Sequence, residues 1–499
     1  MLAGNYYEKN NLIRVSISLA CTLFLYSCAT LAPTATEQSN SSTSQSEPKS
    51  NSEKDKATAR NDSDKPVPFV NPGDGGATNS AKTSKPAFAG APASAPVAET
   101  TTGDVSDSAT LAPMPASAGG STVGGISKEE SDRITSSPII APQPAKKLSA
   151  GNIDDNDKFS EYLEYLNKYG PTFIDKRDVL KVDISNRYII NVHDKDNKSI
   201  SDAVVEITSN NSNVFTGKTY AHGKTLFFPT GIKSINSDCQ QQDCTSAKYS
   251  VTVKKGNLKQ TKEFTLSENR TLDFTLTDKR DVITTPNLDI LFLIDATGSM
   301  GDEIASIQKT IKDIASRISS LELKPNIRYS LVSYKDRNDD YRVKRYDFTS
   351  NLNYFQEILN ELSAGGGGDY PESLNEGLYH SIHKVTWSND KDAVRLVFLI
   401  ADAPPHLDYS DDYKYTDEMV EAVKQGIKIY PVASSGLSEN GEYIFRQLAQ
   451  FTYSKFLFLT YGGDEQTPGT TPHNVGEFKE NNLDDLVVNI VKEELNYLK

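Results

Sequence analysis

Residues 288–300, Leu-Asp-Ile-Leu-Phe-Leu-Ile-Asp-Ala-Thr-Gly-Ser-Met, decide the fold of the C-terminal part of this chain. An apolar run that closes on polar residues and glycine predicts a buried parallel strand. From Gly301 onward, isoleucines recur every three or four residues, which predicts a long amphipathic helix directly after the strand. In open α/β sheets, ligands bind in the crevice beyond the carboxyl ends of the strands. We therefore expect Asp295, Thr297 and Ser299 to face a ligand.

The ligand predicted for this turn is a divalent metal ion. Asp295, Thr297 and Ser299 present one carboxylate and two hydroxyls at alternate positions. Hard oxygen ligands of this kind suit Mg²⁺ or Mn²⁺ better than a soft metal. The competing interpretation is that these side chains only cap the helix that follows.

Two later loops supply further oxygen groups. Residues 365–372, Gly-Gly-Gly-Gly-Asp-Tyr-Pro-Glu, include Asp369. Residues 400–406, Ile-Ala-Asp-Ala-Pro-Pro-His, follow a predicted strand and include Asp402. Each loop alone could be a purely structural turn. Three loops at the ends of one sheet favour a metal, and His406 is a candidate for the rim of the site.

These three segments resemble the metal-ion-dependent adhesion site of von Willebrand factor type A (VWA) domains. The Asp-x-Thr-x-Ser turn resembles the family's Asp-x-Ser-x-Ser motif, and the two loops resemble the second and third metal loops of one subset of that family. The resemblance implies a VWA domain over residues 281–499. It also implies that the hydroxyls ligate the ion directly and that the aspartates often act through water. Asp369 stands where adhesion members commonly carry threonine. The implied metal is Mg²⁺ (or Mn²⁺ or Ca²⁺), and the implied ligands are Asp295, Thr297, Ser299, Asp369 and Asp402.

The remainder of the C-terminal part alternates between apolar strand-like runs and amphipathic helical stretches. Strands are expected around residues 327–334, 394–400, 427–432 and 456–460, and helices around 352–359 and 483–498. Such alternation predicts a doubly wound α/β fold with a Rossmann-like parallel sheet.

The segment before it, residues 151–280, is expected to hold a short helix and a small all-β sandwich. Residues 155–157 can cap a helix with an apolar face from Phe159 to Leu166, and Gly170-Pro171 predicts its end. After residue 182 the apolar period becomes two, which predicts several short strands. The run 192–205 resembles carboxypeptidase-regulatory-like sandwiches.

Cys239 and Cys244 are the cysteines of this expected folded part. In an oxidising compartment, two cysteines so close in sequence predict a disulfide across a short loop. The alternatives are two free thiols or half of a metal site.

The amino-terminal part predicts export and lipid anchoring. Residues 1–27 combine basic residues with a short apolar core, which is typical of a signal peptide. The core ends in Leu25-Tyr26-Ser27-Cys28, which resembles the bacterial lipoprotein box and implies a lipid-modified (palmitate-bearing) Cys28 after cleavage. The alternative is an ordinary signal peptide cleaved nearby. Residues 28–150 are rich in Ser, Thr, Ala and Pro, and we expect them to form a disordered tether.

Composition limits the functions open to the chain. It has 499 residues, 24% of them charged, with a formal net charge of −14 and a pI near 5.1. An acidic chain of this kind argues against a nucleic-acid surface. We expect no small-molecule substrate and no catalysis.

The function that these features favour is an envelope-anchored, divalent-metal-dependent protein-binding module. It would act in adhesion or complex assembly, with the membrane reached through the N-terminal lipid. The resemblance of Ala29 after the lipidated cysteine to outer-membrane sorting suggests the outer membrane of a Gram-negative cell. Two alternatives remain: a metal-dependent phosphohydrolase that uses Asp295, and a structural scaffold with a vestigial metal site.

Overall fold

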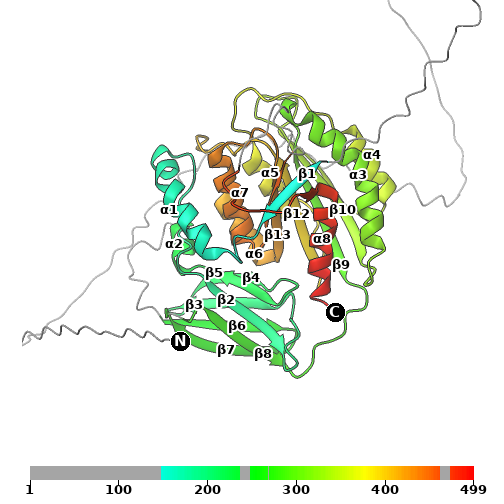
Figure 1. The fold of residues 1–499 in the computed structure, drawn as a ribbon. Helices are drawn as coiled ribbons and strands as arrows, with labels where there is room; N and C mark the ends of the chain where they lie inside the picture. Colours follow the sequence, from blue (N-terminus) through cyan, green and yellow to red (C-terminus); the bar gives the residue numbers. More distant parts are fainter. Residues whose placement is uncertain (1–147, 236–247, 268, 461–472) are drawn as a thin grey trace, which may run out of the picture. The chain divides into compact units, whose positions relative to one another are not determined.

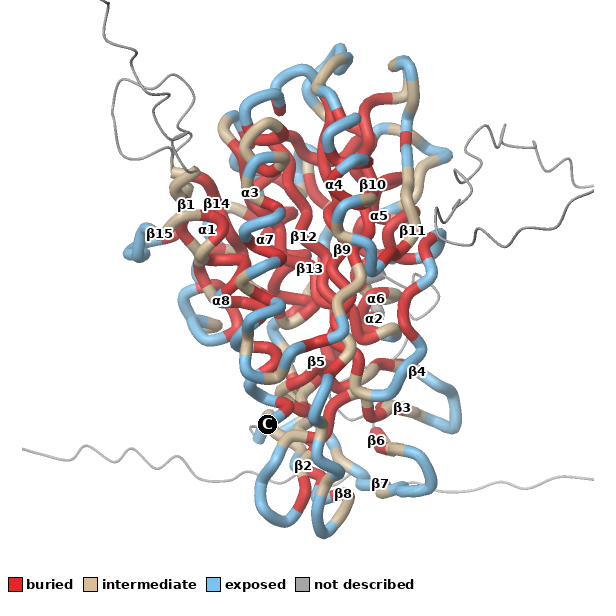
Figure 2. The backbone as a smooth tube through the Cα atoms, turned by 90° about the vertical axis from the view of Figure 1, so that its right-hand side faces the viewer, coloured by how far each residue is buried: buried red, intermediate tan, exposed pale blue. Residues whose placement is uncertain are grey.

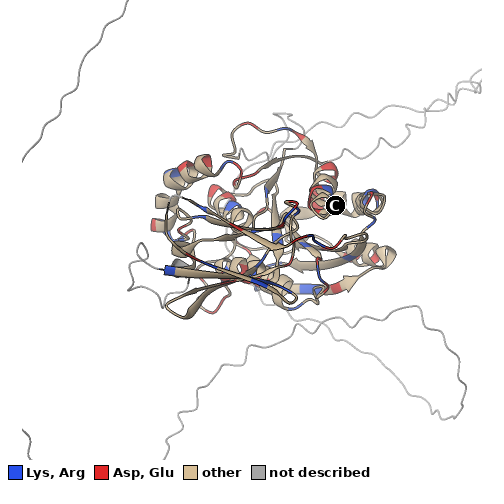
Figure 3. Cartoon of the chain, turned by 90° about the horizontal axis from the view of Figure 1, so that it is seen from below, with Lys and Arg blue, Asp and Glu red and all other residues tan. Residues whose placement is uncertain are grey.

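The computed structural model describes residues 148–235, 248–267, 269–460 and 473–499 (Figure 1). Cys28, Cys239 and Cys244 lie outside these ranges, so the lipidation and disulfide predictions stay predictions. Within the described residues, no helix combines the length and apolar character needed to cross a bilayer. The positions of basic and acidic residues are scattered along the described elements in the cartoon of Figure 3.

The C-terminal part is built on a twisted, mostly parallel sheet with the order β11-β10-β9-β12-β13-β14-β1-β15. Strand β9 pairs in parallel with β10 and β12, and β11 closes that edge as an antiparallel strand. This confirms the predicted doubly wound α/β fold. The strands are β1 (Ser149–Ile153), β9 (Asn287–Asp295), β10 (Asn326–Tyr334), β11 (Val343–Thr349), β12 (Val394–Ala401), β13 (Ile427–Ala433), β14 (Phe456–Leu459) and β15 (Asn481–Asn482).

Helices cover both faces of this sheet, and each face has its own core. Alternate residues of β9 belong to different cores: Ile290 and Phe292 pack in one, Leu291 and Leu293 in the other. A strand covered on both faces has no polar side, which explains its continuous apolar run (Figure 2). The first core is covered by α3 (Gly301–Ser319), α4 (Leu352–Glu361) and α8 (Leu483–Asn496), and the second by α1 (Phe159–Lys176), α5 (Leu374–His383), α6 (Tyr415–Gln425) and α7 (Glu439–Phe451).

The sequence before the α/β part contributes one strand and one helix to it. Strand β1 lies antiparallel between β14 and β15, and α1 packs on α7. The predicted end of α1 at Gly170-Pro171 was wrong, because the helix continues to Lys176. A proline inside a helix costs about 3 kcal/mol. Burial of Phe173 against Tyr443, with ring centroids 5.7 Å apart, offsets that cost.

The middle of the chain forms two small sheets that share a core. One has the order β5-β2-β8 and the other β4-β3-β6-β7. Phe227 of the first sheet contacts Phe215 and Tyr249 of the second, with ring centroids 5.4 and 5.6 Å apart. The elements are β2 (Tyr188–Asp194), β3 (Val204–Ser209), β4 (Ser212–Lys218), β5 (Lys224–Phe227), α2 (Pro229–Ile235), β6 (Lys248–Lys255), β7 (Leu258–Thr265) and β8 (Thr271–Thr277).

These small sheets contact the α/β part at the amino ends of its parallel strands. Lys255 pairs with Asp392 at 2.7 Å, and Arg395 pairs with Asp202 at 3.3 Å. Asp392 and Arg395 lie just before and just inside β12. The carboxyl ends of β9, β10 and β12, where ligands bind in such folds, are at the opposite edge.

Candidate metal centre

The turn after β9 holds one carboxylate in a fully buried position. Asp295 ends the strand and has no exposed surface. Its Oδ1 accepts hydrogen bonds from the backbone N–H of Thr297 at 2.9 Å and from the Thr297 hydroxyl at 2.7 Å. Its Oδ2 is buried and has no hydrogen-bond partner among the described residues. One oxygen of Asp295 is therefore held by the turn, and the other is buried beside the Tyr334 hydroxyl without a well-formed hydrogen bond among the described residues.

The glycine-rich loop packs directly on this turn. The N–H of Gly365 donates to the carbonyl of Ala296 at 3.0 Å, and the N–H of Gly298 donates to the carbonyl of Gly366 at 3.2 Å. Gly367 has a φ of +77°. A Cβ at Gly367 would lie 3.0 Å from Glu372 Oε1 and 3.3 Å from the Cβ of Thr297. Glycine lets the backbone approach closely enough to bring Glu372 up to the Asp295 turn.

Glu372 supplies a second buried carboxylate. The residue is 4% exposed, and its Oε2 has no hydrogen-bond partner among the described residues. Burial, followed by the negative charge of Asp295 and of other nearby aspartates, raises the pKa of Glu372 to about 9. Burial and the charge of Asp402 raise the pKa of Asp295 to about 7, against the hydrogen bonds from Thr297. Carboxylates gathered in a dry space favour either protons or a cation.

Asp402 completes the group from the end of β12. It is 7% exposed, and burial raises its pKa, while a hydrogen bond with Ser299 acts in the opposite direction. Ser299 itself is exposed at the surface of the turn. The structure therefore brings four of the predicted ligands, Asp295, Thr297, Ser299 and Asp402, into one cluster.

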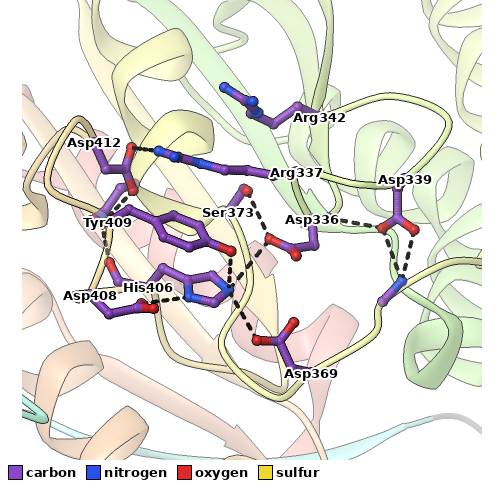
Figure 4. Close-up of polar contacts among 12 residues, drawn as sticks. Asp336, Arg337, Asp339, Arg342, Asp369, Ser373, His406, Asp408, Tyr409 and Asp412 are labelled. Carbon is purple, nitrogen blue, oxygen red and sulfur yellow. Dashed lines mark hydrogen bonds and ion pairs between the residues drawn. The ribbon is translucent and has the colours of Figure 1, made fainter.

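The other two predicted site residues lie together in a neighbouring group. Asp369 has a side chain that is 66% exposed, and its Oδ2 lies 3.9 Å from Nε2 of His406. His406 is buried, and its Nε2 also lies 3.5 Å from Oδ1 of Asp336 (Figure 4). The ion pair found for Asp369 is thus with the histidine that was predicted at the rim.

Comparison with known protein families identifies the α/β part. A family model described as the von Willebrand factor A domain matches residues 289–459. Residues 289–459 form a VWA domain. The match begins in β9 and ends with β14, so it includes the Asp295 turn, the glycine-rich loop and Asp402.

Relatives of the VWA domain occur within much larger proteins. Alpha-protein kinase vwkA of Dictyostelium discoideum is 30% identical over 162 residues, which are 32% of this chain and 25% of that protein. Human von Willebrand factor A domain-containing protein 7 is 29% identical over 121 residues, which are 24% of this chain and 12% of that protein. The chain thus spans a quarter or less of these relatives. Among solved structures, proximal thread matrix protein 1 from the mussel byssus covers 44% of this chain and 48% of its own, with 14% identity and a TM-score of 0.28, too low to support an argument.

Glu372 belongs to the oxygen-rich centre of the VWA domain, but it was not predicted as a site residue from the sequence. Two carboxylates, Asp369 and Glu372, stand three positions apart in the same loop, and composition cannot say which one faces inward. The loop path decides this, because the N–H of Glu372 bonds to the carbonyl of Pro404 at 3.0 Å. The one available signal was Pro371, which restricts the backbone directly before Glu372.

Proposed function

We propose that the VWA domain is a divalent-metal-dependent protein-binding module. The observation that carries this proposal is a pair of buried carboxylate oxygens that make no hydrogen bond within the part of the chain that the structure describes, Oδ2 of Asp295 and Oε2 of Glu372. An unpaired buried carboxylate is costly, and a bound cation removes that cost. VWA domains commonly mediate protein interactions, which fits a binding role for this domain.

The donor set fits a hard divalent ion. Asp295, Glu372 and Asp402 provide carboxylates, and Thr297 and Ser299 provide hydroxyls, all of them oxygen. Mg²⁺ and Mn²⁺ prefer such ligands. When bound, the ion would act as a Lewis acid that accepts one oxygen from a partner protein. The residues of this chain position it and exclude water from its buried side.

The charge of the set limits what the partner can offer. Three carboxylates around a divalent ion leave a net charge of −1 before any partner arrives. Like charges a few ångströms apart at intermediate dielectric repel by about 4 kcal/mol before screening. We therefore propose that the partner supplies a hydroxyl or carbonyl oxygen and not a carboxylate.

The rim offers an aromatic contact for the same partner. Tyr370 is 44% exposed, although its hydroxyl bonds to the carbonyl of Gly436 at 2.8 Å and accepts from the N–H of Ser438 at 2.6 Å. A tyrosine fixed at its tip with an exposed ring loses little entropy on binding, and tyrosine is enriched at binding hot spots. Tyr370 directly follows Asp369 in the sequence, and its hydroxyl lies 3.2 Å from the carbonyl oxygen of Asp402, which supports a contact surface that includes the centre.

The test is metal-dependent capture of a partner. Immobilised full-length protein would be incubated with envelope extract in Mg²⁺ or in EDTA, alongside Ser299→Ala and a matched Ser320→Ala control at the exposed end of α3. We expect partners retained by the parent and by Ser320→Ala in Mg²⁺ to be lost in EDTA and from Ser299→Ala. If the same partners were retained in EDTA and by the Ser299→Ala variant, the result would favour the alternative of a structural scaffold with a vestigial metal site.

We also propose that Cys28 anchors the protein to the membrane through lipid. The support is the sequence of the signal segment and the box that precedes Cys28. Detergent-phase partitioning of Cys28→Ser measures this, and we expect the variant to leave the membrane fraction or to remain unprocessed. Equal membrane retention of the parent protein and the Cys28→Ser variant would contradict the proposed lipid anchor.

A further inference from the structure

Three loops of the VWA domain bring two carboxylates and an imidazole together next to the oxygen-rich centre. Asp336 follows β10, Asp369 lies in the glycine-rich loop and His406 follows β12. One ligand atom from each residue lies within 4.8 Å of the others. Asp336 and His406 are buried, and Asp369 reaches in from the exposed side (Figure 4).

The imidazole is oriented as in metal sites. Nδ1 of His406 lies 2.8 Å from Oδ1 of Asp408, so the proton belongs on Nδ1 and the lone pair of Nε2 faces the two other carboxylates. The ring also stacks on Tyr409, with centroids 4.0 Å apart and planes at 15°. Metal-ligating histidines almost always donate their other N–H to a carboxylate or carbonyl in this way.

We propose that Asp336, Asp369 and His406 form a second metal site and that its ion is Zn²⁺. Imidazole nitrogen suits zinc, whereas the all-oxygen centre suits magnesium. Zn²⁺ bonds nitrogen and oxygen at about 2.0–2.2 Å, so neighbouring ligands of a tetrahedral ion lie about 3.4 Å apart. Nε2 of His406 lies 3.5 Å from Asp336 Oδ1 and 3.9 Å from Asp369 Oδ2, so small side-chain movements complete the site.

The fourth position is open to water or to a neighbouring hydroxyl. The Tyr409 hydroxyl lies 3.2 Å from Nε2 of His406. With the ring proton on Nδ1, this hydroxyl donates a hydrogen bond to Nε2. A zinc ion takes the Nε2 lone pair in place of that hydrogen bond. The Ser373 hydroxyl, 3.2 Å from Asp336 Oδ1, holds the other carboxylate in position.

Zinc at this site joins three separate loops of the binding face. One of them contains Glu372, whose carbonyl accepts from the N–H of His406 at 3.2 Å. The ion therefore stabilises the loop that carries Glu372 without ligating it. The zinc site thus supports the structure of the neighbouring oxygen-rich magnesium site, and the two sites bind different metals.

The experiment is a calorimetric Zn²⁺ titration of full-length protein, prepared without a histidine tag and stripped by chelator, in excess Mg²⁺. Replacement of all four cysteines, Cys21, Cys28, Cys239 and Cys244, by serine provides the background, so that thiolate binding is excluded. We expect one equivalent of Zn²⁺ to bind, His406→Gln to abolish it and Asp408→Asn to weaken it about 10–100-fold. His383→Gln, a histidine on α5 paired with Glu418, is the matched control and should leave Zn²⁺ binding unchanged.

A second variant protects the test against misfolding. Because His406 is buried, His406→Gln could unfold the loops, whereas the exposed Asp369→Asn should keep the native circular dichroism spectrum and still lose at least tenfold in Zn²⁺ affinity. Substitution by Co²⁺ should give the intense visible absorption of a tetrahedral ion. Absence of a zinc equivalent in the background protein, or unchanged affinity in folded Asp369→Asn and His406→Gln, would overturn the proposal. Asp295→Asn separates the two sites, since it should weaken Mg²⁺ and leave Zn²⁺ bound.

Discussion

The backbone N–H of His406 donates a hydrogen bond to the carbonyl oxygen of Glu372 over 3.2 Å. With the bond from the N–H of Glu372 to Pro404 and the parallel bridge between Glu372 and Pro405, it joins the glycine-rich loop to the loop after β12. Glu372 then lies beside the Asp295 turn, and Asp369 lies beside His406. This short backbone pairing thus assigns the two carboxylates of one loop to two different groups.

Glu372→Gln should weaken Mg²⁺ binding more than Asp369→Asn does. Glu372 is buried near Asp295, whereas the side chain of Asp369 is two-thirds exposed. A charge a few ångströms from the ion in a dry site contributes far more than a screened one, so we expect a loss of about tenfold or more for Glu372→Gln and about twofold or less for Asp369→Asn. Calorimetric Mg²⁺ titration measures both. A larger loss of Mg²⁺ affinity for Asp369→Asn than for Glu372→Gln would indicate that Asp369, and not Glu372, ligates the ion.

Without metal, the protein should lose stability as the pH rises. Burial and repulsion raise the pKa of Asp295 to about 7 and that of Glu372 to about 9, from ordinary values of about 4. The folded state then keeps protons that the unfolded state has released, so the contribution of these two groups to the free energy of unfolding is most favourable below about pH 4 and falls as the pH rises towards their folded pKa values.

The size of this decline can be measured by thermal unfolding. A tenfold change in proton affinity corresponds to about 1.4 kcal/mol, so the two raised pKa values predict a loss of several kcal/mol, about 7 kcal/mol at most, between about pH 5 and pH 8.5 in EDTA. Saturating Mg²⁺ should remove most of the loss, because metal binding needs the deprotonated carboxylates. Glu372→Gln in EDTA should show a flatter profile. An identical profile with and without Mg²⁺ would count against a metal held by these groups.

Gly367→Ala should disrupt the oxygen centre, and Gly368→Ala should not. Gly367 has a φ of +77°, and its added methyl would press on Glu372 and Thr297. Left-handed backbone costs an alanine about 1–2 kcal/mol before any contact is counted. A Cβ at Gly368 meets nothing within 4 Å. Unfolding temperature and Mg²⁺ affinity should both drop for Gly367→Ala alone, and equal effects at the two positions would refute the role given to Gly367.

Arg446→Met should destabilise the whole α/β part. Arg446 lies on α7, is buried, and pairs with Asp155 at 2.7 Å and with Glu442 at 3.3 Å. Removing it leaves the buried carboxylate of Asp155 without its cation, which costs about 3–5 kcal/mol. Lys195→Met removes an exposed pair with Asp278 and should change stability by about 1 kcal/mol or less. Urea unfolding compares the two, and a small effect for Arg446→Met would mean that the segment before α1 docks only loosely.

The sequence alone determined the central strand, the turn after it and the fold class. The continuous apolar run of β9 reflects burial of the strand on both faces of the sheet. The alternation of strand and helix periods can likewise be recognised from neighbouring residues alone. Asp295, Thr297, Ser299 and Asp402 could be proposed together for the same reason, because each lies at or just after the end of a strand; their role as metal ligands stays a prediction.

The tertiary structure decided where side chains in loops point and where distant segments join. Glu372 faces Asp295 because its backbone bonds to Pro404, 32 positions away in the chain, and Asp336 meets His406 through loops that no periodic pattern marks. Residues Ser149–Ile153 join the sheet beside β14, and α1 passes through Pro171 because Phe173 packs against Tyr443. Local patterns encode how deeply a residue is buried, whereas the direction of a loop side chain depends on hydrogen bonds and packing that form only when the chain has folded.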